Sequence, residues 1–178
     1  MEIEHLPLAG ALKVTPRIFC DERGFFKEIY SLDRYRQCGV EETFVQDNLS
    51  LTRRNVLRGL HGDSTMAKLV GVVRGSVFDV IVDLRTQSRT YRRWSAATLT
   101  AAEGGQIYVP RGFLHGFLAL EDETVVAYKQ SAFYDPAREF SVAWDDPDLG
   151  IDWPLDGRRP ILSSRDAANP TLRSLCGA

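Results

Sequence analysis

The segment that decides the fold lies in the middle of the chain and reads SVFDVIVDL, residues Ser76–Leu84. Apolar residues recur there at every second position, which is the period of a β-strand. One face of this strand is apolar and consists of Phe78, Val80, Val82 and Leu84. The other face is mixed and consists of Val77, Asp79, Ile81 and Asp83. Because a mid-strand carboxylate is unfavourable unless it is paired, we expect Asp79 to have a partner.

Short segments of similar character lie on both sides of this strand. The further predicted strands are Lys13–Phe19, Lys68–Arg74, Trp94–Thr100, Gln106–Val109, His115–Leu120 and Glu123–Gln130. Helical pattern is sparse: Leu32–Cys38 is expected to form one or two turns, and the Pro-, Asp- and Gly-rich tail after Asp145 to wrap the strands. Many short strands between Gly- and Pro-containing turns predict an all-β fold, a sandwich or an antiparallel barrel with a ligand cavity in its mouth.

Length and charge set limits on the kind of protein. The 178 residues suit a single domain, residues 1–178, without repeats or linkers. The content of 44% hydrophobic and 26% charged residues is ordinary for a globular protein. A net charge of -2 argues against a nucleic-acid or membrane-surface partner, because such partners require excess Lys and Arg. Local basic groups could still bind one small anionic ligand.

The N-terminus and the cysteines point to a cytoplasmic protein. Glu2 and Glu4 occupy the place of a positive signal-peptide region, and no apolar run approaches a membrane span. Cys20, Cys38 and Cys176 are odd in number, widely spaced and without a CxxC pair. Neither a disulfide framework nor a metal knuckle is therefore expected. We expect buried free thiols in a reducing compartment, with Cys176 exposed near the C-terminus.

His61 is one of three histidines and closes the segment Val56–Asp63. A regular strand would place Arg58 and His61 on opposite faces. A bulge at Gly59 would turn both side chains toward one cavity. The local sequence leaves two readings open, a buried structural histidine or a functional one beside Arg58.

Lys68 begins an apolar run and shares a face with Val70 and Val72. If that face is internal, the ammonium enters the cavity and requires an anionic partner; otherwise the side chain extends from a sheet edge into water. A pair between Asp79 and either Lys68 or His115 would satisfy both groups. For His115, which stands before Gly116, a structural hydrogen-bonding role is favoured over a catalytic one.

Two further residues have a functional and a structural reading. Tyr128 shares a strand face with Thr124 and Val126, where its phenol could donate a proton or fill the core. Asp166 could orient a histidine and stabilise its charged form, or it could cap a turn.

Taken together, these segments resemble the dTDP-4-dehydrorhamnose 3,5-epimerase family, in unbroken order from about the tenth residue to the end. The matching segments, given by number, are 21–28, 46–48, 56–61, 68–70, 75–80, 109–117, 134–136, 152–154 and 162–166. The resemblance implies a cupin-type antiparallel β-barrel (a jelly roll) with short peripheral helices. It also implies a homodimer that epimerises a nucleotide-linked 4-keto-6-deoxyhexose at C3, C5 or both, with neither cofactor nor metal.

The resemblance also assigns roles. It implies that His61 is the general base, Asp166 its carboxylate partner, Tyr128 the general acid and Lys68 the group that stabilises the enolate. Asp79 and His115 match supporting residues of the cavity. The positions that match the nucleotide and diphosphate site are Arg23, Phe26, Glu28, Gln46, Asn48, Arg58 and Tyr134, with Glu139 and Trp153 as further matches.

The loop between His61 and Lys68 departs from the family pattern. Members usually have an aromatic residue, a Gln and a Pro-rich loop there, whereas this chain has the shorter Gly62–Ala67. A C3-only epimerase, or one that acts on a GDP- or CDP-linked sugar, is therefore an alternative. Two other classes remain as rivals: a metal-dependent cupin, although the sequence has no His-x-His pair, and a non-catalytic carbohydrate-binding cupin.

Overall fold

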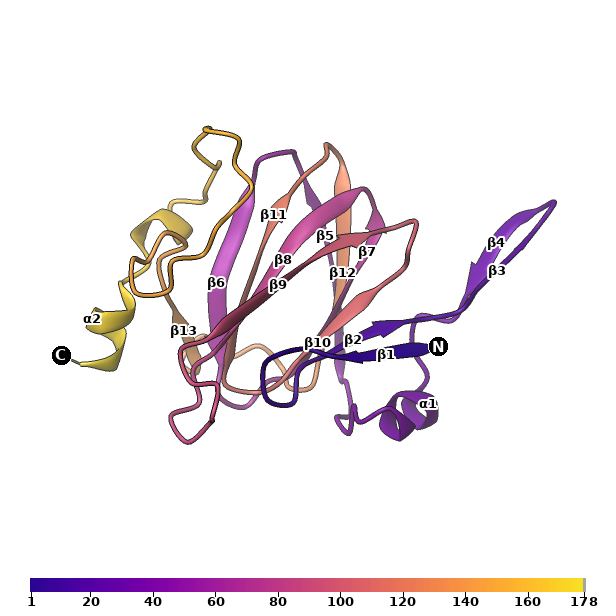
Figure 1. Cartoon of the computed structure of the whole chain (residues 1–178), viewed down its shortest axis with the longest axis horizontal. Helices are drawn as coiled ribbons and strands as arrows, with labels where there is room; N and C mark the ends of the chain where they lie inside the picture. The colour runs from indigo at the N-terminus through magenta and orange to yellow at the C-terminus, as the bar shows by residue number, and fades with distance from the viewer. Residues whose placement is uncertain (178) are drawn as a thin grey trace.

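The computed structural model describes residues 1–177, apart from the side chain of Cys176, and its strands form two facing sheets (Figure 1). The six-stranded sheet has the order β1 (Glu2–His5), β2 (Leu12–Thr15), β10 (Gln106–Val109), β7 (Lys68–Arg74), β12 (Thr124–Gln130) and β5 (Gln46–Thr52). The five-stranded sheet has the order β13 (Glu139–Ser141), β6 (Leu57–Asp63), β11 (Phe113–Ala119), β8 (Ser76–Asp83) and β9 (Trp94–Thr100). All of these pairs are antiparallel, which confirms the predicted all-β barrel architecture.

The remaining elements lie outside the two sheets. β3 (Ile18–Asp21) and β4 (Gly24–Lys27) form a separate hairpin that projects from the body of the molecule (Figure 1). The helix α1 (Leu32–Gln37) follows the hairpin, and the C-terminal tail contains the 3-10 helix η1 (Asp166–Ala168) and α2 (Leu172–Cys176). No helix in residues 1–177 is long and apolar enough to cross a membrane.

Apolar side chains are buried in three places. The first cluster fills the space between the sheets and includes Val70, Val72, Ile81, Leu99, Ile107 and Val126. The second lies between the five-stranded sheet and the C-terminal tail and includes Leu57, Val80, Leu114, Val142, Trp153 and Leu172. The third lies under α1 and includes Leu12, Val14, Tyr35, Leu69 and Tyr108. Both sheets therefore bury apolar side chains on two faces.

The strand β8 shows what this layering does to the sequence pattern. Its predicted apolar face packs under the C-terminal tail, through Val80 and Val82. Its mixed face points into the barrel, where Val77 and Ile81 contribute to the interior core and Asp79 is fully buried. The alternation predicted the strand correctly, and the mixed face is the one that faces the interior.

Two predictions about the chain were wrong. The predicted strand Lys13–Phe19 is divided into β2 and β3, because Pro16 has no N–H to donate to a sheet. Cys20 is exposed and Cys38 is half-buried, although both were expected to be buried; both are free thiols. The expected exposure of Cys176 concerns a side chain outside the described part of the chain.

The predicted irregularity at Gly59 is confirmed in β6. His61 is opposite His115 and Arg58 is opposite Phe117, so Gly59 and Leu60 together face the single residue Gly116. The φ angle of Gly59 is 128°, and a Cβ atom there would lie 2.6 Å from the Gly116 Cα atom. A side chain at this position is therefore excluded by both conformation and space. The extra residue lets Arg58 and His61 line the same cavity.

Candidate active site

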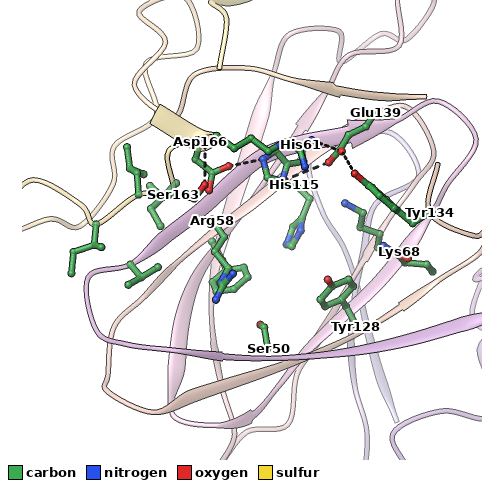
Figure 2. A pocket seen from close by; sticks show the side chains of 17 residues that line it. Ser50, Arg58, His61, Lys68, His115, Tyr128, Tyr134, Glu139, Ser163 and Asp166 are labelled. Carbon is green, nitrogen blue, oxygen red and sulfur yellow. Dashed lines mark hydrogen bonds and ion pairs between the residues drawn. The ribbon is translucent and has the colours of Figure 1, made fainter. Parts of the chain in front are cut away.

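A cavity of about 520 Å³ opens between the two sheets and gathers most of the residues singled out in the sequence. The five-stranded sheet supplies Arg58 and His61 from β6, His115 from β11 and Glu139 from β13. The six-stranded sheet supplies Lys68 from β7 and Tyr128 from β12, and the C-terminal tail supplies Asp166. Figure 2 shows these side chains pointing into one space, with His61 across the cavity from Tyr128.

His61 forms a close contact with the carboxylate of Asp166. The Nε2 atom of His61 lies 2.6 Å from Oδ1 of Asp166, which is 5% exposed. Asp166 is held in place because its backbone N–H donates to the Ser163 hydroxyl at 3.0 Å, at the start of η1. Burial alone would raise the pKa of Asp166, but the hydrogen bonds from His61 and Ser163, with the positive charges nearby, lower it below the ordinary value. Asp166 is therefore a carboxylate that can fix one tautomer of His61.

Glu139 lies on the other side of the His61 ring. Its Oε1 atom is 3.8 Å from Nδ1 of His61. Its Oε2 atom accepts one hydrogen bond from the Tyr134 hydroxyl at 3.1 Å and another from the Arg165 guanidinium. Glu139 thus joins the imidazole to two donors at the rim of the cavity.

His115 and Asp79 form a second, deeper pair. Nε2 of His115 lies 2.8 Å from Oδ2 of Asp79, and Asp79 is fully buried. This contact confirms the expectation that the mid-strand carboxylate is paired. His115 itself lines the cavity, so the histidine for which a structural role was favoured also faces the candidate site.

Lys68 extends from the first position of β7 into the cavity (Figure 2). Burial lowers the pKa of Lys68, and the negative charges of Glu139, Asp63 and Asp79 oppose this effect. The internal reading of this lysine is therefore confirmed. An ammonium group that is largely removed from water can interact strongly with an anionic ligand.

Tyr128 stands on the same sheet as Lys68, one strand away. Burial raises the pKa of the Tyr128 phenol, the positive charge of Arg58 lowers it in part, and the negative charge of Glu139 adds to the rise. The phenol is consequently protonated at neutral pH and available as a proton donor.

Six predicted site residues do not line this cavity within the chain: Asp79, which contacts the cavity residue His115, and five residues that lie elsewhere. Gln46 and Asn48 lie on β5 and bind each other, with 2.9 Å between Gln46 Nε2 and Asn48 Oδ1. The other three lie in or next to the projecting hairpin: Arg23 binds Asp21, the Phe26 ring is 68% exposed, and Glu28 pairs with Arg34 at 3.0 Å. Trp153 is a core residue that packs edge-on against Phe78.

The cavity also contains residues that the sequence did not single out. Ser50 and Gln130 line its six-stranded wall, and Ser163 and Arg165 line the side formed by the tail. The Ser50 hydroxyl and the Gln130 Oε1 atom are buried without a hydrogen-bond partner among the described residues. In the sequence, Ser50 and Gln130 each follow a predicted site residue by two positions. This spacing, which places both side chains on the same strand face, was the only sign that they line the cavity.

The connection between β6 and β7 adopts a compact form. Asp63 is buried, and its Oδ1 atom accepts hydrogen bonds from the Thr65 backbone N–H at 2.7 Å and from the Thr65 hydroxyl at 2.8 Å. At Gly62, where the family pattern has an aromatic residue, the Phe140 ring occupies the space: a Cβ atom would lie 2.4 Å from Phe140 Cε2. Contacts with Thr65 and Phe140 therefore shape the segment that follows His61.

A β-barrel whose cavity holds a histidine on one sheet, paired with a carboxylate of the C-terminal tail, and a half-buried lysine and tyrosine on the other sheet has the architecture of a cupin-type acid–base enzyme. The family model of dTDP-4-dehydrorhamnose 3,5-epimerase matches residues 5–174. The chain belongs to the dTDP-4-dehydrorhamnose 3,5-epimerase family and is an isomerase.

Individual relatives agree with this assignment. The dTDP-4-dehydrorhamnose 3,5-epimerase of Methanothermobacter thermautotrophicus is 46% identical over 91% of this chain and 89% of its own length. The epimerase structure from Mycobacterium tuberculosis superposes with a TM-score of 0.95 at 42% identity, over 99% of this chain and 90% of that one. A 3'-monoepimerase from Streptomyces bikiniensis, solved with dTDP-quinovose, has a TM-score of 0.89 at 37% identity, over 97% and 89% of the two chains.

Proposed function

We propose that this enzyme inverts C3, C5 or both carbons of a dTDP-linked 4-keto-6-deoxyhexose by proton transfer through an enolate. The observation that carries the proposal is the 2.6 Å contact of His61 with Asp166 in a cavity whose opposite wall holds Tyr128 and Lys68. Further support comes from relatives that are named for this reaction.

The chemistry follows from the ketone. A carbonyl at C4 acidifies the hydrogens on C3 and C5, because loss of either gives an enolate whose charge rests on O4. His61 is the proposed base, since its imidazole lines the cavity and is paired with the Asp166 carboxylate. Because Asp166 accepts at Nε2, the lone pair that takes the proton is on Nδ1. The carboxylate then stabilises the charged ring, and acid–base steps of this kind contribute roughly 10²–10⁴-fold each.

The opposite wall completes the reaction in this proposal. Lys68 stabilises the negative charge on O4, and the loss of such a preorganised donor typically costs about 3–4 kcal/mol of barrier. Tyr128 delivers a proton to the face of the sugar opposite His61, which inverts the carbon. No electron or group is transferred, so the reaction as written requires no cofactor.

Substrate recognition is assigned to the remaining polar residues. Arg58, His115, Tyr134 and Glu139 line the cavity and are proposed to bind the sugar and diphosphate, with Asp79 supporting His115. A guanidinium suits diphosphate oxygens, and a ring such as Phe26 suits stacking on a base. The proposed nucleotide-binding residues are Arg23, Phe26, Glu28, Gln46 and Asn48.

We also propose that the enzyme is a homodimer. The projecting hairpin exposes the rings of Phe19, Phe25 and Phe26 by 50%, 67% and 68%, and Leu49 and Leu51 on the edge strand β5 are 69% and 64% exposed. The exposure of these five large apolar side chains favours a protein–protein contact. A hairpin seated on a second copy would carry Arg23, Phe26 and Glu28 to that copy's cavity, which would explain why they lie outside their own.

Two broader features complete the proposal. Residues 1–178 act as one catalytic domain, since the sheets, α1 and the tail share buried clusters that join distant parts of the chain. The free thiols of Cys20 and Cys38 suit the reducing cytoplasm as the place of action.

The second candidate function is that of a C3-only epimerase. An epimerase that acts on a GDP- or CDP-linked 4-keto sugar is a further alternative. The compact loop beside His61 favours a departure from the common specificity, and the similarity to a 3'-monoepimerase is compatible with it. The two candidates differ in the carbons that exchange a proton, C3 alone or both C3 and C5.

The experiment that tests the proposal is solvent exchange in D₂O followed by NMR. Purified enzyme is incubated with dTDP-, GDP- and CDP-linked 4-keto-6-deoxyglucose. We expect deuterium to enter at C3, or at C3 and C5, most rapidly with the dTDP sugar. Absence of exchange into all three sugars, by folded protein, would contradict the proposal and favour a carbohydrate-binding role.

A further inference from the structure

Gln130 lies in the wall of the cavity that the six-stranded sheet forms, and the proposed mechanism gives it no role. It follows Tyr128 by two residues on β12, so both side chains point to the same face of the sheet. Across the sheet it is opposite Lys68 of β7 on one side and Gln46 of β5 on the other. The amide therefore lies in the same row as the Lys68 side chain, and it lines the cavity.

The amide oxygen of Gln130 is unsatisfied. The residue is only 7% exposed, and Oε1 is buried without a donor among the described residues. Leaving a buried acceptor unpaired costs roughly 1–3 kcal/mol, and buried polar groups nearly always have partners. A donor that enters the cavity with a ligand would satisfy this atom.

A second glutamine of the same sheet shows the contrast. Gln106 on β10 is 9% exposed, and its side chain is fully engaged within the protein. Its Oε1 accepts from the Tyr35 hydroxyl at 2.5 Å, and its Nε2 donates to the Ile29 carbonyl at 2.9 Å. Gln106 is a structural residue, whereas Gln130 lines the cavity and has an unpaired acceptor.

The chemistry of the substrate identifies the donor, an argument that rests on the proposed function. Lys68 contacts O4 in that mechanism, and adjacent strands lie only about 4.8 Å apart. Of the two carbons next to C4, C5 bears a methyl group in a 6-deoxy sugar and has no donor. C3 bears a hydroxyl, which can donate to Oε1 of an amide beside Lys68.

We propose that Gln130 is a substrate-binding residue whose side-chain oxygen accepts a hydrogen bond from the C3 hydroxyl of the 4-keto sugar. This hydroxyl changes orientation when C3 is inverted. Gln130 therefore senses the configuration of a reacting carbon, and it is a determinant of which sugar the enzyme accepts.

The test compares Gln130→Met with wild type on two substrates, dTDP-4-keto-6-deoxyglucose and its 3-deoxy analogue. Methionine keeps the length of the side chain and removes the amide. The measured quantity is kcat/KM for solvent deuterium exchange, and each variant-to-wild-type ratio is compared between the substrates. We expect Gln130→Met to lose about tenfold on the 3-hydroxy sugar, the effect of one buried hydrogen bond, and less than about twofold on the 3-deoxy analogue.

Controls separate the alternatives. Gln87→Met, at an exposed position outside the cavity, should match wild type on both substrates. Equal losses on both substrates, or no loss on either, would overturn the assignment, and a loss that disappears with the 2-deoxy analogue instead would move the contact to another hydroxyl. If Gln130→Met does not fold, Gln130→Glu keeps the acceptor oxygen and should retain the preference for the 3-hydroxy sugar; loss of that preference would contradict the proposal. Wild-type protein that exchanges neither substrate refutes the proposed function itself, and the inference with it.

Discussion

At the scale of single residues, the environment decides what each ionisable group can do. His61 touches a carboxylate that is kept charged by hydrogen bonds, whereas Tyr128 is kept neutral by burial. These opposite effects suit the two walls of the cavity to the opposite tasks of the proposed mechanism, proton acceptance and proton donation. Lys68 is the third group of this kind, because burial weakens its hold on the proton.

The lowered pKa of Lys68 predicts a pH dependence. The ammonium is present below its pKa, so activity that requires it is lost as pH rises through a value below the ordinary 10.5. Burial shifts the pKa of Tyr128 in the opposite direction, upward, so we expect Lys68 rather than Tyr128 to set the alkaline limb of kcat/KM. Lys68→Arg keeps the charge at all accessible pH values and should shift this limb upward, with a reduced maximum.

The pH profile of kcat/KM for both proteins, from pH 6 to the limit of stability, measures this. An unshifted alkaline limb in Lys68→Arg would show that another group limits the reaction at high pH.

Some site residues could be predicted from the sequence on physical grounds, and others could not. The buried mid-strand Asp79 required a partner, and His115 is that partner. Asp166 and His61 are far apart in sequence, so only the family resemblance joined them. Gln130 was not predicted, because an amide two residues after Tyr128 is equally compatible with a structural role such as that of Gln106.

At the scale of elements, β5 and β6 explain why the strand pattern was incomplete. β5 was not predicted because its pattern is inverted: its inward side chains Gln46, Asn48 and Ser50 are polar, and its outward Leu49 and Leu51 are exposed. A strand that lines a polar cavity and a protein surface lacks the ordinary amphipathic alternation. In β6 the bulge at Gly59 interrupts the period, whereas the regular strands β7, β9 and β10 were predicted with their observed bounds.

The glycine at position 62 supports an element-scale prediction. A Cβ atom there would lie 2.4 Å from the Phe140 ring on β13 and 2.7 Å from the Phe113 backbone oxygen on β11. These clashes would force β6 away from both neighbouring strands. We expect Gly62→Ala to lower the free energy of unfolding by about 1–3 kcal/mol. The control is Gly105→Ala, whose nearest contact, the flexible Lys13 side chain at 3.2 Å, can move.

Thermal or urea unfolding of the two variants measures the difference. Equal stability of Gly62→Ala and Gly105→Ala would show that Phe140 does not fill the place of the missing side chain.

At the scale of the whole molecule, the hairpin predicts the assembly. Phe19→Ser with Phe25→Ser removes two exposed rings from the proposed interface while leaving the proposed nucleotide residues in place. Each large interface anchor is worth about 2 kcal/mol or more, and the double variant removes two rings from each copy, so the dimer should be weakened by at least about a thousandfold. The control, Leu175→Ser, lies on α2, at the other side of the molecule (Figure 1).

Light scattering after size exclusion at several concentrations gives the mass. A wild-type monomer, or a double variant that dimerises as well as wild type, would contradict the proposed role of the hairpin.

The proposed mechanism depends on both sheets: one places His61, and the other places Tyr128, on opposite walls of the cavity that would hold the sugar. The most direct measurement follows deuterium exchange and inversion separately, by NMR in D₂O, in His61→Ala and Tyr128→Phe. We predict that His61→Ala loses both by about 10²–10⁴-fold. Tyr128→Phe should keep exchange and lose inversion, because the base can return a proton only to its own face. Inversion at the wild-type rate in Tyr128→Phe, or exchange at the wild-type rate in His61→Ala, would contradict the proposed His61–Tyr128 mechanism.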